Sequence, residues 1–227
     1  MIDPPEGRPL PELTGLLRSV AGLPALARNF RALPRGEGAP VLVLPGFMTS
    51  DRSTFGLRRF LGRLGYDAHG WGLGRNHGYL DRLMPQVVAK IERLAAQHGQ
   101  PVRLVGWSLG GVIAREASRH PMAHVDRIIT LGTPVVGGPK YTLSASYYQK
   151  NGIDVDAVAA RFDARNAQPL SVPVVAIYSR SDQIVSWQAC LDPNPQNRTE
   201  HIEVATSHTG LGFDRHVYRL IARHLRA

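Results

Sequence analysis

Cysteine is almost absent from this chain of 227 residues: Cys190 stands alone, so no internal disulfide can form. Long apolar runs are also lacking, and none approaches the roughly 18 residues that a membrane-spanning helix needs. The first residues do not show a basic segment followed by an apolar one, the pattern of a secretory signal. We therefore expect a cytoplasmic protein in a reducing environment.

Acidic residues are outnumbered, with 18 Asp and Glu against 27 Lys and Arg, which gives a net charge of +9. The arginines are scattered, and only 7% of residues are aromatic. Because no nucleic-acid motif accompanies this charge, we expect no nucleic-acid partner. A chain of this length can bury about 70% of its unfolded surface, so neither a metal site nor a disulfide is expected.

Short apolar runs alternate with amphipathic segments along the chain. The runs predict strands at 41–44, 66–71, 101–106, 127–131, 173–178 and 201–204. Helical patterns occupy 50–64, 79–98, 110–120 and 213–226. This alternation predicts an α/β fold, a doubly wound and mostly parallel sheet flanked by helices. The polar segment near 140–168 is the sole sizeable insertion in the domain at 37–227, and it predicts a small cap over a cleft.

Residues 1–36 are expected to form an N-terminal arm and helix. The first 12 residues are rich in proline and charge, which predicts a loosely held arm. Apolar residues at helical spacing over 13–33 predict a helix that breaks near Pro24. This helix is expected to pack on the core. The alternative is weak contact with a membrane surface, favoured by Arg18, Arg28 and Arg31.

The strongest chemical signal is Gly-Trp-Ser-Leu-Gly at residues 106–110. It follows a buried strand and precedes an apolar helix, which predicts a sharp turn that exposes the Ser108 hydroxyl in a cleft. Glycines flank the serine because a Cβ there would clash with the neighbouring strand and helix. Ser108 is therefore the predicted nucleophile.

A serine hydroxyl needs a base, usually a histidine that a carboxylate orients. For this turn the chain order is serine, acid, histidine. Asp182 follows a later strand, and His208 lies in the loop after the last strand, so both are predicted catalytic residues. The alternative acids are Asp126, Asp156, Asp163 and Asp192, and the other histidines considered are His201, His216 and His224.

Two backbone N–H groups should stabilise the oxyanion that forms during attack on a carbonyl. Leu109 follows the nucleophile, and Phe47 lies in the loop after the first buried strand, so these are the predicted donors. Met48, Trp187 and Leu211 are candidates for an apolar substrate pocket. The glycine-rich loop at 72–78 does not have the G-x-G-x-x-G spacing of a dinucleotide site.

With these residues located, the chain resembles the α/β-hydrolase superfamily, and in detail compact bacterial lipases and esterases with a minimal lid. The resemblance rests on Gly-Trp-Ser-Leu-Gly-Gly from 106, Ser-Asp-x-Ile-Val from 181 and Ser-His-x-Gly-Leu-Gly from 207. It implies hydrolysis of a small-molecule ester or lipid through an acyl-enzyme, without a cofactor. The chain departs from the common pattern at Pro45, where many lipases have histidine, and at Trp107, where histidine is also common.

The same catalytic residues serve thioesterases, amidases and perhydrolases, so these activities remain alternatives. A non-catalytic binding protein with this fold is a further alternative, although such a protein would usually lack one of the three catalytic residues.

Overall fold

A computed structural model describes residues 2–226, apart from the side chains of residues 27–29, so the predicted role of Arg28 lies outside the described residues. Six strands form one sheet in the order β2-β1-β3-β4-β5-β6, and all of its neighbouring pairs are parallel. The strands are β1 (Pro40–Leu44), β2 (Asp67–Gly70), β3 (Val102–Trp107), β4 (Val125–Leu131), β5 (Val174–Tyr178) and β6 (Thr199–Glu203). The predicted α/β class is therefore confirmed.

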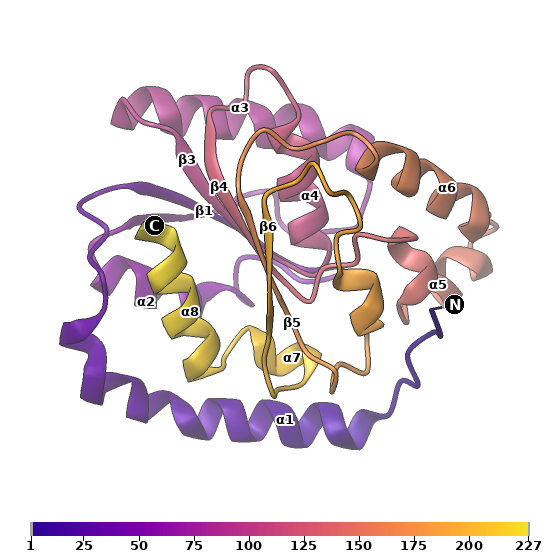
Figure 1. Ribbon diagram of the computed structural model, residues 1–227, viewed down its shortest axis with the longest axis horizontal. Coiled ribbons are helices and arrows are strands. Elements are labelled where there is room, and N and C mark those ends of the chain that lie inside the picture. Colours follow the sequence, from indigo (N-terminus) through magenta and orange to yellow (C-terminus); the bar gives the residue numbers. More distant parts are fainter. Residues whose placement is uncertain (1, 227) are drawn as a thin grey trace.

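Helices cover both faces of the sheet (Figure 1). On one face, α2 (Phe55–Arg63) and α8 (Arg215–Arg226) bury the side chains of Val41, Val105 and Ile129. On the other face, α3 (Leu80–His98) and α4 (Leu109–Ser118) pack over Leu42 and Leu104. The remaining helices are α1 (Pro9–Gly22), α5 (Ala145–Lys150), α6 (Val155–Asn166) and α7 (His208–Leu211), with 3₁₀ segments η1 (Leu23–Ala32), η2 (Gly138–Tyr141) and η3 (Trp187–Cys190).

The strand order explains where a site can form. The chain reverses its direction of travel across the sheet between β1 and β3, and parallel sheets bind ligands beyond the carboxyl ends of strands at such a switch point. Phe47 follows β1, Ser108 follows β3, Asp182 follows β5, and His208 follows β6. The fold therefore brings all four predicted residues to the same edge of the sheet.

The N-terminal segment differs from the expectation of a loose arm. Helix α1 already begins at Pro9, because proline is tolerated in a first turn where its missing N–H needs no partner. It runs beside α7 (Figure 1) and buries Glu12 and Ser19, while Leu13 and Leu17 are exposed. The side that faces the protein is thus the polar one, contrary to the expected packing of apolar residues on the core.

Helix α2 starts at Phe55, later than the predicted start near Ser50. The Asp51 carboxylate, in the segment before this helix, accepts hydrogen bonds from the backbone N–H groups of Trp71 (2.9 Å) and Gly72 (3.0 Å). Asp51 therefore joins the chain after β1 to the chain after β2. In the described part of the chain, no helix is long and apolar enough to cross a membrane.

Candidate active site

Ser108 occupies a strained turn between β3 and α4. Its φ of 53° and ψ of −122° lie in a region that side-chain-bearing residues rarely adopt. The turn is held by the Ser108 N–H, which donates to the Leu131 carbonyl (2.7 Å), and by the Ser108 carbonyl, which accepts from Thr133 Oγ1 (2.9 Å). This geometry matches the nucleophile turn predicted from the sequence.

The neighbouring glycines permit the turn because backbone crowds them closely. A Cβ on Gly106 would lie 2.4 Å from the Gly111 Cα, and one on Gly110 would lie 2.2 Å from the Leu44 carbonyl oxygen. Helix α4 can therefore approach β1 and β3 closely enough to bring its N-terminus to Ser108. Leu109 is the first residue of α4, where the N–H has no partner within the helix and is free for an oxyanion.

His208 and Asp182 form a buried pair. The Nδ1 atom of His208 lies 2.6 Å from Oδ2 of Asp182. The other oxygen, Oδ1, accepts hydrogen bonds from the N–H groups of Ile184 (2.8 Å) and Val185 (2.7 Å). Because both oxygens are engaged, the carboxylate is fixed in one orientation and in turn orients the imidazole.

Electrostatics also favour the charged form of this histidine. Burial by itself lowers the pKa of His208, but the Asp182 charge and hydrogen bond, together with the Glu12 charge, raise it above its usual value of 6.5. A higher pKa makes the imidazole a stronger base. It also stabilises the imidazolium that forms when His208 accepts a proton.

Glu12 is a residue of the site that the sequence did not indicate. Its Oε1 accepts hydrogen bonds from the N–H groups of Gln183 (2.9 Å) and His208 (3.1 Å). Its Oε2 accepts from the N–H (3.0 Å) and the hydroxyl (2.9 Å) of Thr209. Burial opposes the charge, but the N–H donors of Thr209, Gln183 and His208 lower the pKa of Glu12 below 4.5. One carboxylate therefore ties the acid loop to the base loop.

The loop after β1 is anchored by Asn76, which lies in the glycine-rich segment at 72–78 and is fully buried. The side-chain amide of Asn76 donates to the Pro45 carbonyl (2.8 Å), and the backbone carbonyl of Asn76 accepts the Met48 N–H (2.7 Å). Among the described residues, the N–H of Phe47 makes no hydrogen bond. That donor is therefore available at the position that the sequence analysis assigned to it.

Trp107, the unusual residue before the serine, contacts the base loop. Its indole N–H donates to the His208 carbonyl (3.3 Å), and the two ring centroids lie 6.2 Å apart. On its other side the indole packs edge-on against Phe213. Tryptophan at this position thus stabilises the loop that carries His208 through a hydrogen bond.

Ser108 and His208 open into one cavity of about 740 Å³. Its lining is mainly apolar and aromatic, with Phe47 and Leu109 beside the serine and residues from the segment predicted as a cap opposite. Phe47 packs against Tyr147 and Tyr148 of α5, with ring centroids 5.4 and 6.1 Å apart. Three arginines also reach the lining: Arg82, Arg161 and Arg165.

The three predicted pocket residues lie outside this lining. Met48 is 40% exposed, in a turn with φ of 57°. Trp187 stacks on Tyr178, with ring centroids 6.0 Å apart. Leu211, the last residue of α7, is fully buried in the core cluster. Apolar character alone did not separate residues that line a cavity from residues that fill the core.

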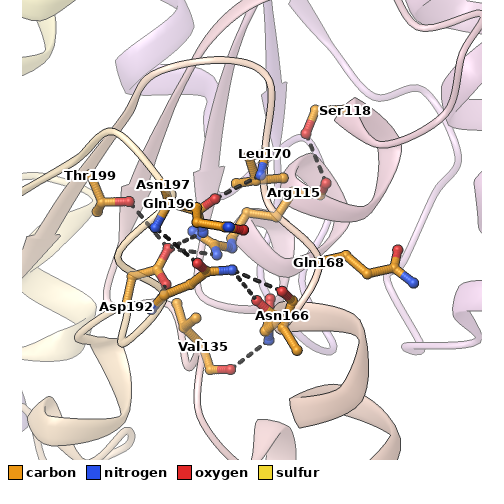
Figure 2. Close-up of polar contacts among 12 residues, drawn as sticks. Arg115, Ser118, Val135, Asn166, Gln168, Leu170, Asp192, Gln196, Asn197 and Thr199 are labelled. Atoms are coloured by element: carbon orange, nitrogen blue, oxygen red, sulfur yellow. Dashed lines mark hydrogen bonds and ion pairs between the residues drawn. The ribbon is translucent and has the colours of Figure 1, made fainter.

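The alternative acids are engaged elsewhere. Asp126 pairs with Arg103, Asp156 with Lys140, and Asp163 accepts the Gly137 N–H. Asp192 forms a buried ion pair with Arg115 of α4 (2.8 Å), surrounded by Asn166, Asn197 and Thr199 (Figure 2). The alternative His201 accepts the Asp192 N–H, away from the serine.

Two kinds of comparison relate this chain to known proteins. The family model of the PGAP1-like alpha/beta domain matches residues 67–207, more than half of the chain. Among solved structures, a member of the pair LipS and LipT, two metagenome-derived lipolytic enzymes, is 16% identical, with 86% of this chain and 94% of that chain covered and a TM-score of 0.64.

Two other solved structures are similar. Aspergillus fumigatus lipase B is 19% identical, with 87% of this chain and 57% of that chain covered and a TM-score of 0.64. The N-formylmaleamic acid deformylase of Pseudomonas putida S16 is 19% identical, with 83% and 92% covered and a TM-score of 0.57. At these identities the likeness shows the α/β-hydrolase fold and confirms the resemblance seen in the sequence.

Proposed function

The chain belongs to the family of PGAP1-like alpha/beta domains, and from this premise we propose that it is a serine hydrolase that cleaves carboxylic esters. The observation that carries the proposal is the buried pair of His208 and Asp182, joined at 2.6 Å, with His208 lining the same cavity as Ser108. A serine on a strained turn, a histidine and an orienting carboxylate are the components of acyl transfer.

The reaction runs in two steps. As the Ser108 oxygen bonds to the carbonyl carbon, Nε2 of His208 takes the hydroxyl proton, and the N–H groups of Phe47 and Leu109 hold the oxyanion. The bond from carbon to the leaving oxygen then breaks, and His208 returns the proton to the departing alcohol. Water attacks the acyl-enzyme by the same route, which releases the acid and regenerates Ser108.

The cavity suggests the kind of ester. Its apolar and aromatic lining favours an acyl chain, because burying each methylene contributes about 0.8 kcal/mol. The guanidinium groups of Arg82, Arg161 and Arg165 favour an ester that also carries an anionic group. We therefore propose an acyl ester with a negatively charged head, such as a phospholipid, as the substrate class.

Hydrolysis of p-nitrophenyl esters from acetate to palmitate tests the activity. We expect turnover by the wild type and a loss of about six orders of magnitude in kcat for Ser108→Ala, as for other serine hydrolases that lose the nucleophile. Thioester and amide analogues in parallel distinguish the alternative activities. If the wild type turns over none of these substrates while binding them, the non-catalytic alternative replaces the proposal.

We also propose that α1 docks on anionic membranes. Four apolar side chains on the outer side of α1 are 46–69% exposed: Leu10, Leu13, Leu17 and Val20. Arg18, Arg31 and Arg35 are exposed in this N-terminal segment, whereas Glu12 is buried, so this surface complements a negative bilayer. The chain before α1 also reaches the cavity, because Gly7 lies against Leu143, which lines it.

Vesicle sedimentation tests this docking. Wild type should sediment with vesicles of phosphatidylcholine and phosphatidylglycerol, and less so in high salt. The double variant Leu13→Ser/Leu17→Ser should stay in the supernatant, whereas Met122→Ser, which changes an exposed apolar residue elsewhere, should behave as wild type. Equal sedimentation of the two variants would exclude the bilayer as the occupant of this surface. So would light scattering that shows a dimer for wild type and for Met122→Ser but a monomer for the double variant.

A further inference from the structure

Away from the active site, the edge strand β2 brings a carboxylate and two imidazoles together. Asp67 and His69 stand two positions apart in β2, so both side chains lie on the same face of the strand. His98, the last residue of α3, faces them. The Nε2 atoms of His69 and His98 lie 2.8 and 2.9 Å from one oxygen, Oδ2 of Asp67.

Hydrogen bonding accounts for only part of this arrangement. His98 forms a well-oriented hydrogen bond to Asp67. The Nε2 atom of His69, by contrast, is shielded from solvent and has no hydrogen-bond partner among the described residues. Its only close neighbour of opposite charge is the oxygen that His98 already contacts, so a further partner at this nitrogen would be stabilising.

We propose that Asp67, His69 and His98 bind a divalent transition-metal ion of the Zn²⁺ class. Their ligand atoms all lie within 4.8 Å of one another. Two imidazole nitrogens and one carboxylate oxygen form a zinc donor set, with bonds of about 2.0–2.2 Å and a fourth position for water. The side chain of Asp67 is 47% exposed, so it can shift by the few tenths of an ångström that these bonds require.

The position of the cluster shows which elements a bound ion would join. Strand β2 is short, lies at the edge of the sheet and, among the described strands, pairs with β1 alone. An ion held by β2 and by the last residue of α3 would join this edge strand to that helix. None of the three residues lines the cavity that contains Ser108, so the proposal is independent of ester hydrolysis.

Titration of chelator-treated protein with Zn²⁺, in competition with a chromophoric chelator, tests the proposal. We expect one ion per chain and a higher melting temperature, because an ion that binds the folded state stabilises it. His69→Ala should weaken binding at least about tenfold, since even the loss of an outer-shell partner has that effect. His216→Ala, which removes an exposed histidine of α8, is the matched control and should bind as wild type.

Co²⁺ gives a second readout, because the absorption bands of a four-coordinate site should appear in wild type and vanish in His69→Ala. His98→Ala repeats the test if circular dichroism shows that His69→Ala is misfolded. Absence of one-to-one binding in wild type, or equal affinity in His69→Ala and His216→Ala, would overturn the proposal.

Discussion

The carboxylate of Glu12 accepts a hydrogen bond from the backbone N–H of His208, which joins the first helix to a residue near the far end of the chain. The same oxygen accepts the N–H of Gln183, next to Asp182. Glu12 thus acts as a positioning residue for both loops of the proposed triad. Removing α1 would also remove Glu12, so point variants test this helix more cleanly than truncation does.

The first prediction concerns Glu12→Gln. An amide can replace only one of the two accepting oxygens, so buried N–H groups lose their partner at a cost of about 1–3 kcal/mol. If that cost falls on the transition state, kcat/KM should drop about 5- to 150-fold. The acid limb of the pH profile should also move to lower pH, because the Glu12 charge contributes to the raised pKa of His208.

The control for this variant is Glu6→Gln, which changes an exposed acid of the same segment. It should leave both the rate and the pH profile unchanged. A purely structural role of Glu12 would lower the rate without moving the acid limb.

The second prediction concerns the effect of Glu12 on stability. Because folding lowers the pKa of Glu12, its ionised form stabilises the protein above pH 4.5, and this contribution is lost as the pH falls through the pKa of the folded state. Urea denaturation should therefore show a difference between wild type and Glu12→Gln that is greatest at neutral pH. A difference that stays constant from pH 7 to pH 3 would contradict this account.

The third prediction concerns the pH dependence of the reaction. Neutral His208 is the base, so kcat/KM should fall as the pH drops, with a midpoint above the usual value of 6.5. Asp182→Asn removes the charge and hydrogen bond that raise the pKa, so its midpoint should move lower. Its rate should also fall by about 10⁴, as the imidazole loses its orientation. A wild-type midpoint at or below 6.5 would count against the role assigned to Asp182.

The fourth prediction uses two glycines in different surroundings. Gly110→Ala would place a Cβ 2.2 Å from the Leu44 backbone, so it should destabilise the protein by several kcal/mol and abolish activity. Gly62→Ala lies in helix α2, and its new Cβ would meet no heavy atom within 4 Å beyond its chain neighbours and the backbone of its own helix, so it should stabilise by about 0.4–1 kcal/mol. Thermal denaturation measures both effects, and similar melting temperatures for the two variants would refute the packing argument.

The fifth prediction concerns the buried ion pair between Arg115 and Asp192. Arg115→Met leaves the Asp192 charge unpaired in the interior, so unfolding should become easier by about 3–5 kcal/mol. Arg103→Met breaks a more exposed pair with Asp126 and should cost only about 0–1 kcal/mol. Urea denaturation compares them, and equal losses would show that burial does not control the strength of these pairs.

Much of the site could be predicted because the relevant signals are local in the sequence. The glycines around Ser108 reflect a turn that needs close backbone contact, and a parallel sheet brings the loops that follow its strands to one edge, where serine, acid and histidine can meet. Asp182 and His208 could be selected because each lies in the loop that follows a strand.

Contacts between segments far apart in the chain were decided by the tertiary structure alone. Glu12 looked like part of a loose arm, and only the packing of α1 against α7 shows that its carboxylate is buried. Asp67, His69 and His98 converge because β2 lies beside the end of α3, and Met48, Trp187 and Leu211 lie outside the cavity lining. Composition and spacing identify residue types and local turns, whereas the partner of a polar group and the surroundings of an apolar one depend on distances set by the folded chain.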